Sequence, residues 1–331
     1  MKKSLLALAV LASAAGAANA ASSVTMYGRM DVGYESAHHD GKSVTQDNGV
    51  ANTNMSRFGI KGQEDLGNGL AATFKLEGRF NGDTGSYAKD MFDRESTVGL
   101  KGNFGSIRFG RATAALENGL GDFVIGERAL GFSNYASATR HSNSAFYDYS
   151  VGGFTAGANV STKGGDKGNT VGTIAEGASG TKVGYGLYAK YSANNFALGA
   201  AYQRDGYGFD SDTATYTAPT KEWGVAASYT FNPVTLGASY ADQKIDGTST
   251  HTKTINAFVS GAVTANDTVY AQYNRVKVTN ASATTAYGLG YNHALSKRTS
   301  VYGEVARNKR TSLTGELVSG YDYSVAMRHA F

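Results

Sequence analysis

GYDYSVAMRHAF, residues 320–331, ends the chain with side chains that alternate in character. The first set is largely apolar, with aromatic rings at both ends: Tyr321, Tyr323, Val325, Met327, His329 and Phe331. The second set is small or charged: Asp322, Ser324, Ala326, Arg328 and Ala330. A period of two predicts a β-strand, and a tilted transmembrane strand needs roughly 9–11 residues. An apolar face and a polar face suit a wall between lipid and water, although a terminal strand of a soluble β-sandwich could alternate in the same way.

The same alternation continues through the rest of the chain and favours the lipid–water wall. It predicts strands near residues 24–34, 55–65, 70–80, 94–102, 105–111, 140–150, 154–162, 182–192, 196–205, 221–231, 234–243, 253–264, 268–278, 284–294, 299–308 and 319–331. Short turns alternate with long loops, which is the arrangement of outer-membrane barrels. We therefore expect an all-β fold, a transmembrane antiparallel β-barrel of about sixteen strands. Only 2 prolines and no cysteine occur, so paired backbone rather than disulfides must hold such a chain together.

The first twenty residues have the pattern of a secretory signal peptide. Lys2 and Lys3 precede an apolar run, and Ala18-Asn19-Ala20 supplies the small residues of a cleavage site. The apolar run is too short for a transmembrane helix. We expect residues 1–20 to be the signal and residues 21–331 to form a single barrel domain. Loss of the two signal lysines lowers the formal net charge from +4 to +2, which gives no support for a nucleic-acid partner.

One loop differs from the others. Residues 112–139 form the longest segment between predicted strands, and they are apolar for an exposed loop. The apolar members are Leu116, Phe123, Val124, Ile125, Leu130, Phe132 and Tyr135. Long loops in compact folds are usually functional, and we expect this one to fold into the barrel and pack against the inner wall. A short external helix or a contact with another protein is the alternative.

The charged side chains indicate what the interior contains. If the apolar faces point to lipid, the opposite faces carry Arg29, Arg57, Lys61, Lys75, Arg79, Arg140 and Arg328 into the barrel. Lipid-facing arginine costs roughly 2–4 kcal/mol at the bilayer midplane, so a water-filled lumen is expected. Alternation alone does not place Arg94, which shares the parity of Val98 and Leu100.

The long loop carries three acids, Glu117, Asp122 and Glu127. A basic wall opposite an acidic loop would set a transverse field across a narrow opening, which selects polar solutes and charges at close quarters. More arginines than acids predict a mild anion preference. The simpler alternative is that each charge is solvated or paired with a neighbour.

Catalytic and metal-binding motifs are weak. His141-Ser142 resembles the dyad of outer-membrane phospholipases, but adjacent strand residues point to opposite faces. His38-His39-Asp40 lies in a polar segment with no second cluster. No phosphate-binding glycine motif is present. We expect no enzyme activity, no cofactor and no metal.

Four stretches resemble the general-diffusion porins of the Gram-negative outer membrane, especially the neisserial and β-proteobacterial branch. They are SVTMYGRMDVG at 23–33, SRFGIKGQEDLGNGL at 56–70, DRESTVGLKGNFGSIRFGR at 93–111 and the terminal AMRHAF. The resemblance implies a sixteen-stranded barrel, a homotrimer, and a third extracellular loop folded inward as a constriction. It also implies a setting in outer-membrane lipid and lipopolysaccharide.

The resemblance also assigns roles to individual residues. It places Arg29, Arg57, Arg94 and Arg140 in the basic cluster at the constriction, and it makes Phe331 part of the signal read by the barrel-assembly machinery. The loop lacks the Pro-Glu-Phe-Gly-Gly tip of enterobacterial members, so the roles of Glu117, Asp122 and Glu127 rest on their charge alone. We expect a passive channel for small hydrophilic solutes and ions. A closed barrel that serves mainly as a surface adhesin or antigen is the alternative.

Overall fold

The computed structural model describes residues 22–39, 49–51, 56–87, 90–162, 183–206, 208–210, 215–311 and 317–331. The predicted signal peptide lies outside these residues. No helix among them is both long and apolar enough to cross a membrane.

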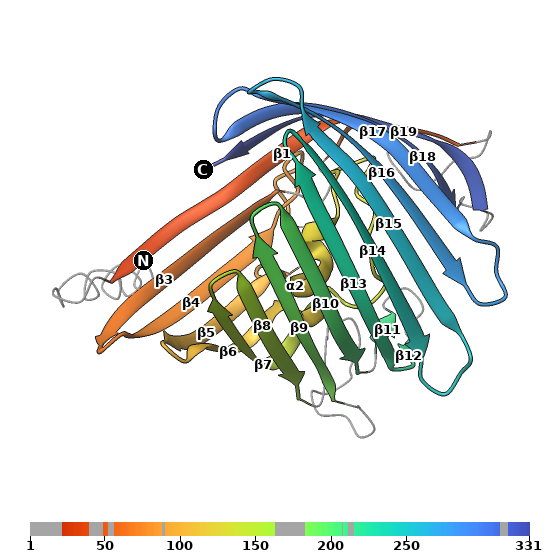
Figure 1. Cartoon of the computed structure of the whole chain (residues 1–331). Helices are drawn as coiled ribbons and strands as arrows, with labels where there is room; N and C mark the ends of the chain where they lie inside the picture. The colour runs from red at the N-terminus through yellow and green to blue at the C-terminus, as the bar shows by residue number, and fades with distance from the viewer. Residues whose placement is uncertain are drawn as a thin grey trace.

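The described chain forms a closed antiparallel barrel of sixteen strands (Figure 1). It closes where β1 pairs with β19, from Arg29 opposite Ala330 to His39 opposite Gly320. The short β2 and β3 both pair with β1 and make one interrupted barrel strand. β11 and β12 form a separate two-stranded sheet. The strands are β1 Ser23–His39, β2 Gly49–Ala51, β3 Arg57–Gly67, β4 Leu70–Arg79, β5 Glu95–Gly102, β6 Gly105–Thr113, β7 Arg140–Val151, β8 Phe154–Ser161, β9 Gly184–Ala193, β10 Phe196–Asp205, β11 Gly208–Asp210, β12 Thr215–Thr217, β13 Thr220–Phe231, β14 Val234–Ile245, β15 His251–Ala262, β16 Asp267–Val278, β17 Thr284–Ala294, β18 Thr299–Thr311 and β19 Leu317–Ala330.

The predicted barrel class and strand number are confirmed, with some shifted boundaries. Strand β1 runs to His39, beyond the predicted end at residue 34, because β19 supplies backbone partners for its polar residues. Strand β18 likewise continues to Thr311 beside Leu317. The polarity of these residues predicts a loop, but a strand continues as far as its neighbour supplies backbone hydrogen-bonding partners.

Side-chain exposure in β19 follows the predicted alternation. Val325 and Met327 are 67% and 51% exposed, whereas Asp322 and Ser324 are 2% and 3% exposed. Apolar side chains therefore cover the outside of the barrel, and polar side chains turn toward the interior. This inversion of a soluble fold is what a lipid-facing barrel requires.

The main apolar cluster lies inside the barrel, between the wall and the segment that joins β6 to β7. This segment, residues 114–139, contains α2 (Ala115–Leu120) and the 3-10 turn η1 (Gly121–Phe123). Figure 1 shows α2 behind β9 and β10. Its buried Leu116, Leu120 and Phe123 pack against small or aromatic wall residues: Tyr188, Ala201, Ala226, Ala241 and Phe258. We call residues 114–139 the inner loop.

Candidate pore constriction

Two inward-facing glutamates hold the backbone of the inner loop. The carboxylate of Glu304 accepts the N–H groups of Glu127, Arg128 and Leu130 at 2.8, 2.9 and 3.1 Å. The carboxylate of Glu222, which is 0% exposed, accepts the N–H groups of Ala136 and Ser137. Hydrogen bonds to an ionised acceptor are roughly twice as strong as neutral ones. The loop is therefore fixed to β18 and β13 through its main chain.

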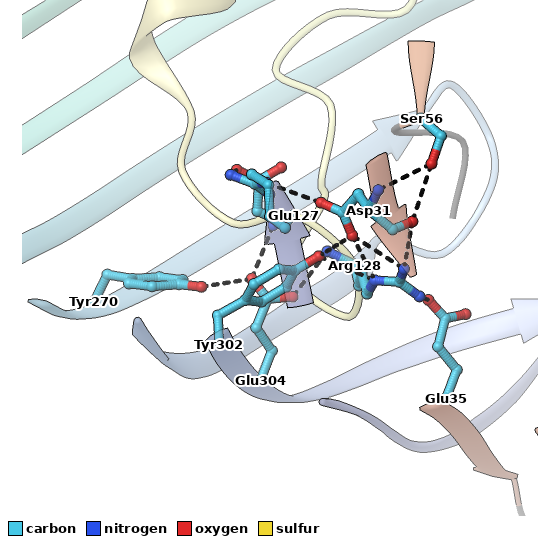
Figure 2. Close-up of polar contacts among 9 residues, drawn as sticks. Asp31, Glu35, Ser56, Glu127, Arg128, Tyr270, Tyr302 and Glu304 are labelled. Carbon is cyan, nitrogen blue, oxygen red and sulfur yellow. Dashed lines mark hydrogen bonds and ion pairs between the residues drawn. The ribbon is translucent and has the colours of Figure 1, made fainter. Parts of the chain in front are cut away.

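Arg128 adds a third anchor (Figure 2). Its guanidinium is fully buried and donates to Glu35 at 2.8 Å, to Asp31 at 3.0 Å and to the Tyr302 hydroxyl at 3.0 Å. Arg328 of β19 reaches the other oxygen of Asp31 at 2.9 Å. The network joins the loop to β1, β18 and β19, and a buried arginine of this kind is costly to strip of its partners.

Amide side chains complete the docking. The side-chain oxygens of Gln203 and Gln272 accept the N–H groups of Leu116 and Ile125, each at 3.0 Å. Asn256 donates to the carbonyl of Phe123 at 3.0 Å. Because these donors and acceptors sit on strands β10, β15 and β16, the loop crosses the interior instead of leaving it.

A row of arginines lines the opposite part of the inner wall. Arg29 of β1 lies directly opposite Arg57 of β3, and Arg57 lies directly opposite Arg79 of β4. Arg57 also interacts electrostatically with Arg94, and Arg94 with Arg140 of β7. Like charges directly across a ladder destabilise a sheet. A row of this kind therefore needs a compensating charge or water.

Arg94 turns inward, in the direction that the family resemblance implied. Arg94 lies just before β5, so the in-and-out alternation of that strand does not fix its direction. Its Nε donates to the carboxylate of Glu77 on the inner face of β4. Glu77 also accepts from the Tyr27 hydroxyl at 2.7 Å. The partner on the neighbouring strand, not the local pattern, fixes the direction of Arg94.

The structure places the three loop acids in two different settings. Glu127 pairs with Arg328 at 2.7 Å and is an electrostatic neighbour of Arg29 and Arg57. Glu117 is an electrostatic neighbour of Arg140. Asp122 is instead 75% exposed and pairs with Lys190 of β9 at 2.8 Å. Glu117 and Glu127 are thus electrostatic neighbours of the arginine row. Asp122 forms an ion pair with Lys190 elsewhere on the wall.

The hydroxyl of Tyr135 holds Glu117 in place by donating a hydrogen bond to its carboxylate. Burial, followed by the negative charge of Glu117, raises the pKa of Tyr135 above its ordinary value. The phenol therefore stays protonated and can keep donating to the Glu117 carboxylate. This hydrogen bond holds the Glu117 side chain of the inner loop, which is an electrostatic neighbour of Arg140 on β7.

Sequence reasoning missed Arg128, Glu222 and Glu304 as loop anchors. Glu222 and Glu304 do alternate onto the polar faces of their strands, which is the signal that could have found them. Arg128 is the one basic residue between Ala112 and Thr139, in an otherwise apolar stretch. The contacts themselves span up to 177 residues of sequence, so no local pattern links the partners.

The histidine–serine pair has another role. His141 is 2% exposed and lies between Asp205 at 2.9 Å and Asn159 at 2.7 Å. Ser142 accepts a hydrogen bond from Arg111 at 2.6 Å. Each residue thus has its own structural partners. Among the described residues, no group of three or more His, Asp or Glu side chains is placed to hold a metal.

Phe331 is tied to the first strand. Its N–H donates to the carbonyl of Gly28 at 3.1 Å, and its carbonyl accepts from the N–H of Gly28 at 3.0 Å. The ring covers the outer side of Gly28, where an added Cβ would lie 2.4 Å from a ring carbon. Glycine is needed there so that the last residue can close the barrel seam.

A closed barrel with an apolar outside, a polar inside and a loop pinned across its interior defines the class of transmembrane β-barrel channels. The chain belongs to the Gram-negative porin family, whose model matches residues 7–313. It is therefore an outer-membrane protein.

Two relatives and one solved structure show how close the family members are. Outer membrane porin protein 32 of Delftia acidovorans is 32% identical over the full length of both chains. An outer membrane porin protein of Bordetella pertussis is 34% identical over 73% of this chain and 69% of its own. The solved anion-selective porin from Comamonas acidovorans is 30% identical, has a TM-score of 0.74, and is matched over 94% of this chain and 100% of its own.

Proposed function

We propose that this chain forms a passive, water-filled channel for small hydrophilic solutes and ions, with a mild preference for anions. The observation that carries the proposal is the row Arg29, Arg57, Arg94 and Arg140 on the wall, with Glu117 and Glu127 on the loop opposite. The anion selectivity named for the Comamonas relative supports it. Sixteen strands enclose more space than side chains fill, which favours a conducting barrel over a closed adhesin.

The arginines of the wall and the carboxylates of the inner loop act on a solute through their electrostatic field, and the proposal involves no chemical reaction. A hydrated solute that passes between arginines and carboxylates can align its dipole with the transverse field. Two unit charges 4 Å apart in water interact by about 1 kcal/mol. Each arginine near the path therefore raises the local anion concentration about fivefold, and the two facing acids offset part of this. The proposal requires no catalytic residue and no cofactor.

The test is the reversal potential of single channels in planar bilayers under a KCl gradient. The double variant Arg57→Gln with Arg94→Gln should shift this potential toward cation selectivity. Lys297→Gln with Arg298→Gln removes the same charge from an exposed turn and should leave the potential unchanged. An unchanged potential in the first variant would place Arg57 and Arg94 away from the ion path.

We also propose that a homotrimer forms, that cleavage after Ala20 releases the mature chain, and that the barrel-assembly machinery reads Phe331. The family resemblance supports all three, and the ring of Phe331 is 51% exposed on the lipid-facing side. Closure of one inserted particle in three equal conductance steps would support both the pore and the trimer. A particle that closes in one step would contradict the trimer, and a particle that never conducts would favour the adhesin.

A further inference from the structure

A hollow of about 410 Å³ lies inside the barrel, between the inner loop and the wall. The loop contributes the segment from Val124 to Glu127, and the wall contributes inward-facing residues of β15 to β19 near the short turns. Among the described residues that line this space, none belongs to the arginine row. We call the space between residues 124–127 and these strands the loop hollow.

The loop segment beside the hollow is held in a fixed shape. The N–H of Ile125 donates to Gln272 at 3.0 Å, and the N–H of Glu127 donates to Glu304 at 2.8 Å. Between them, Gly126 has a φ of 96°, in the left-handed region that favours glycine. Small-molecule sites are usually preformed hollows of roughly 300–1,000 Å³. The loop hollow therefore has both the size and the preformed shape of such a site.

The wall of the hollow carries polar side chains whose hydrogen-bonding groups remain available. Within the described part of the chain, four half-buried side chains form no hydrogen bond: Ser260, Thr268, Asn292 and Ser300. The register sets Thr268 directly opposite Asn292, and Asn292 directly opposite Tyr302. Hydroxyl and amide groups can both donate and accept. They can therefore contact either the positive or the negative end of a dipolar solute.

One edge of the hollow carries a positive and a negative charge. Arg328 of β19 and Glu127 of the inner loop both line it and pair at 2.7 Å, with side chains that are 20% and 28% exposed. Asp31 accepts from the Nε of Arg328 at 2.9 Å, and the guanidinium lies 5.0 Å from the centre of the Tyr302 ring. Glu127 holds the loop through its N–H, so its carboxylate can face a solute. A solute in the hollow thus meets both signs of charge in fixed positions.

The inner loop also gives the hollow an apolar surface. Val124 and Ile125 line it and are only half-buried. The ring of Tyr270 adds to this surface, since its hydroxyl is bound to Glu304 at 2.8 Å (Figure 2). Removal of apolar surface from water is favourable. Hydrogen-bonding groups, an ion pair and an apolar surface therefore occur together, and an amino acid presents the complementary groups.

We propose that the loop hollow binds zwitterionic amino acids with apolar side chains. The carboxylate of the solute faces Arg328, its ammonium faces Glu127, and its side chain contacts Val124 and Ile125. The role of the site rests on the proposed function, because the bound amino acid lies beside the path of solutes through the lumen. One member of the ion pair attracts an ion of either sign and the other repels it. A zwitterion instead faces both members with opposite charges.

Leucine and its α-hydroxy amide isomer provide the test, because the two have the same atoms and the same side chain while only leucine carries charges. Equilibrium dialysis of the native barrel in detergent measures binding of labelled leucine and its displacement by unlabelled probes. Leucine should bind about fivefold more tightly than the isomer, since one close charge pair in water is worth about that factor. Leucine amide, a cation, and α-hydroxyisocaproate, an anion, should also displace leucine less well than leucine itself.

Matched variants locate the site. Glu127→Gln should abolish the advantage of leucine over the isomer, whereas Asp122→Asn, which changes a loop acid that pairs with Lys190 elsewhere on the wall, should keep it. Asn292→Leu should weaken binding of both probes, because it removes hydrogen-bonding groups from the hollow. Equal binding of leucine and the isomer to the native barrel, or an undiminished advantage in Glu127→Gln, would overturn the proposal.

Single-channel recording of the same proteins separates this proposal from the proposed function. Channels that conduct ions but bind leucine no better than its isomer would refute the amino-acid site and leave the channel intact. A barrel that prefers leucine but conducts no ions would refute the channel and leave the site. If Glu127→Gln does not fold, the order of the four probes on the native barrel still decides the outcome.

Discussion

Replacing Glu304 with glutamine should loosen the inner loop while leaving the barrel closed. In the native chain, one oxygen of Glu304 accepts the Glu127 N–H and the Tyr270 hydroxyl, each at 2.8 Å. The other oxygen accepts the N–H groups of Arg128 and Leu130. Glutamine has the same shape but only one oxygen and no charge. Its amide NH₂ must face at least one of these donors.

The geometry sets the size of the effect. The better glutamine orientation points its NH₂ at Tyr270, whose hydroxyl can turn to accept, and leaves the Glu127 N–H without an acceptor. A buried donor without a partner costs about 1–3 kcal/mol, and each remaining bond loses about 1 kcal/mol as its acceptor becomes neutral. The total of about 3–5 kcal/mol raises the undocked population of this loop segment by about two to four powers of ten.

Single-channel recording measures this population directly. The Glu304→Gln channel should show frequent brief steps and excess noise at the open level, because a displaced loop changes the narrowest cross-section. Tyr270→Phe, which removes one of the four donors, should show a smaller increase. Glu64→Gln makes the same chemical change at an exposed position and should match the native record. Open-level noise in Glu304→Gln equal to that of Glu64→Gln would refute the view that this carboxylate pins the loop.

The remaining predictions concern the seam and the loop acids. Gly28→Val should lower the temperature at which the folded barrel unfolds on a heat-modifiability gel, because its side chain would displace the ring of Phe331 at a cost of about 1–3 kcal/mol; an unshifted temperature would show that the seam tolerates the change. Glu127→Gln should increase anion selectivity measured by reversal potential, since it removes a charge beside the arginine row, by about fivefold at most. Asp122→Asn should change the potential less, because Asp122 is exposed and pairs with Lys190, and the opposite ranking would place Asp122 at the ion path.

The sequence was most informative where structure is local. Each strand of a barrel repeats the same two-residue rule, so β19 and its neighbours could be placed from alternation, and the class of fold followed. Strand ends were less certain: the polar residues after Tyr34 stay in the sheet because β19 pairs with them. Arg94 could not be placed from its own strand, because its direction depends on Glu77 of β4.

The candidate constriction was also predictable only in part. Alternation alone predicts that Arg29, Arg57 and Arg140 point inward, because a charged side chain that faces lipid costs free energy. The loop acids could be counted from the sequence but not positioned. Glu127 is an electrostatic neighbour of Arg29 and Arg57 in the arginine row, whereas Asp122 pairs with Lys190, because the path of the inner loop depends on its anchors.

The amino-acid sequence by itself thus determined the closed barrel, its lipid-facing and water-facing sides, and the inward direction of Arg29, Arg57 and Arg140, since each depends on neighbours in the chain and on the cost of burying charge in hydrocarbon. Only the tertiary structure decided how the inner loop is held, by Glu222, Glu304 and the buried Arg128. Barrel closure brings strands more than 80 residues away in sequence against that loop. The alternation of residues within one strand does not predict contacts between segments so far apart in the sequence. The register across strands, which sets Thr268 beside Asn292 and Asn292 beside Tyr302, is likewise a property of the closed sheet.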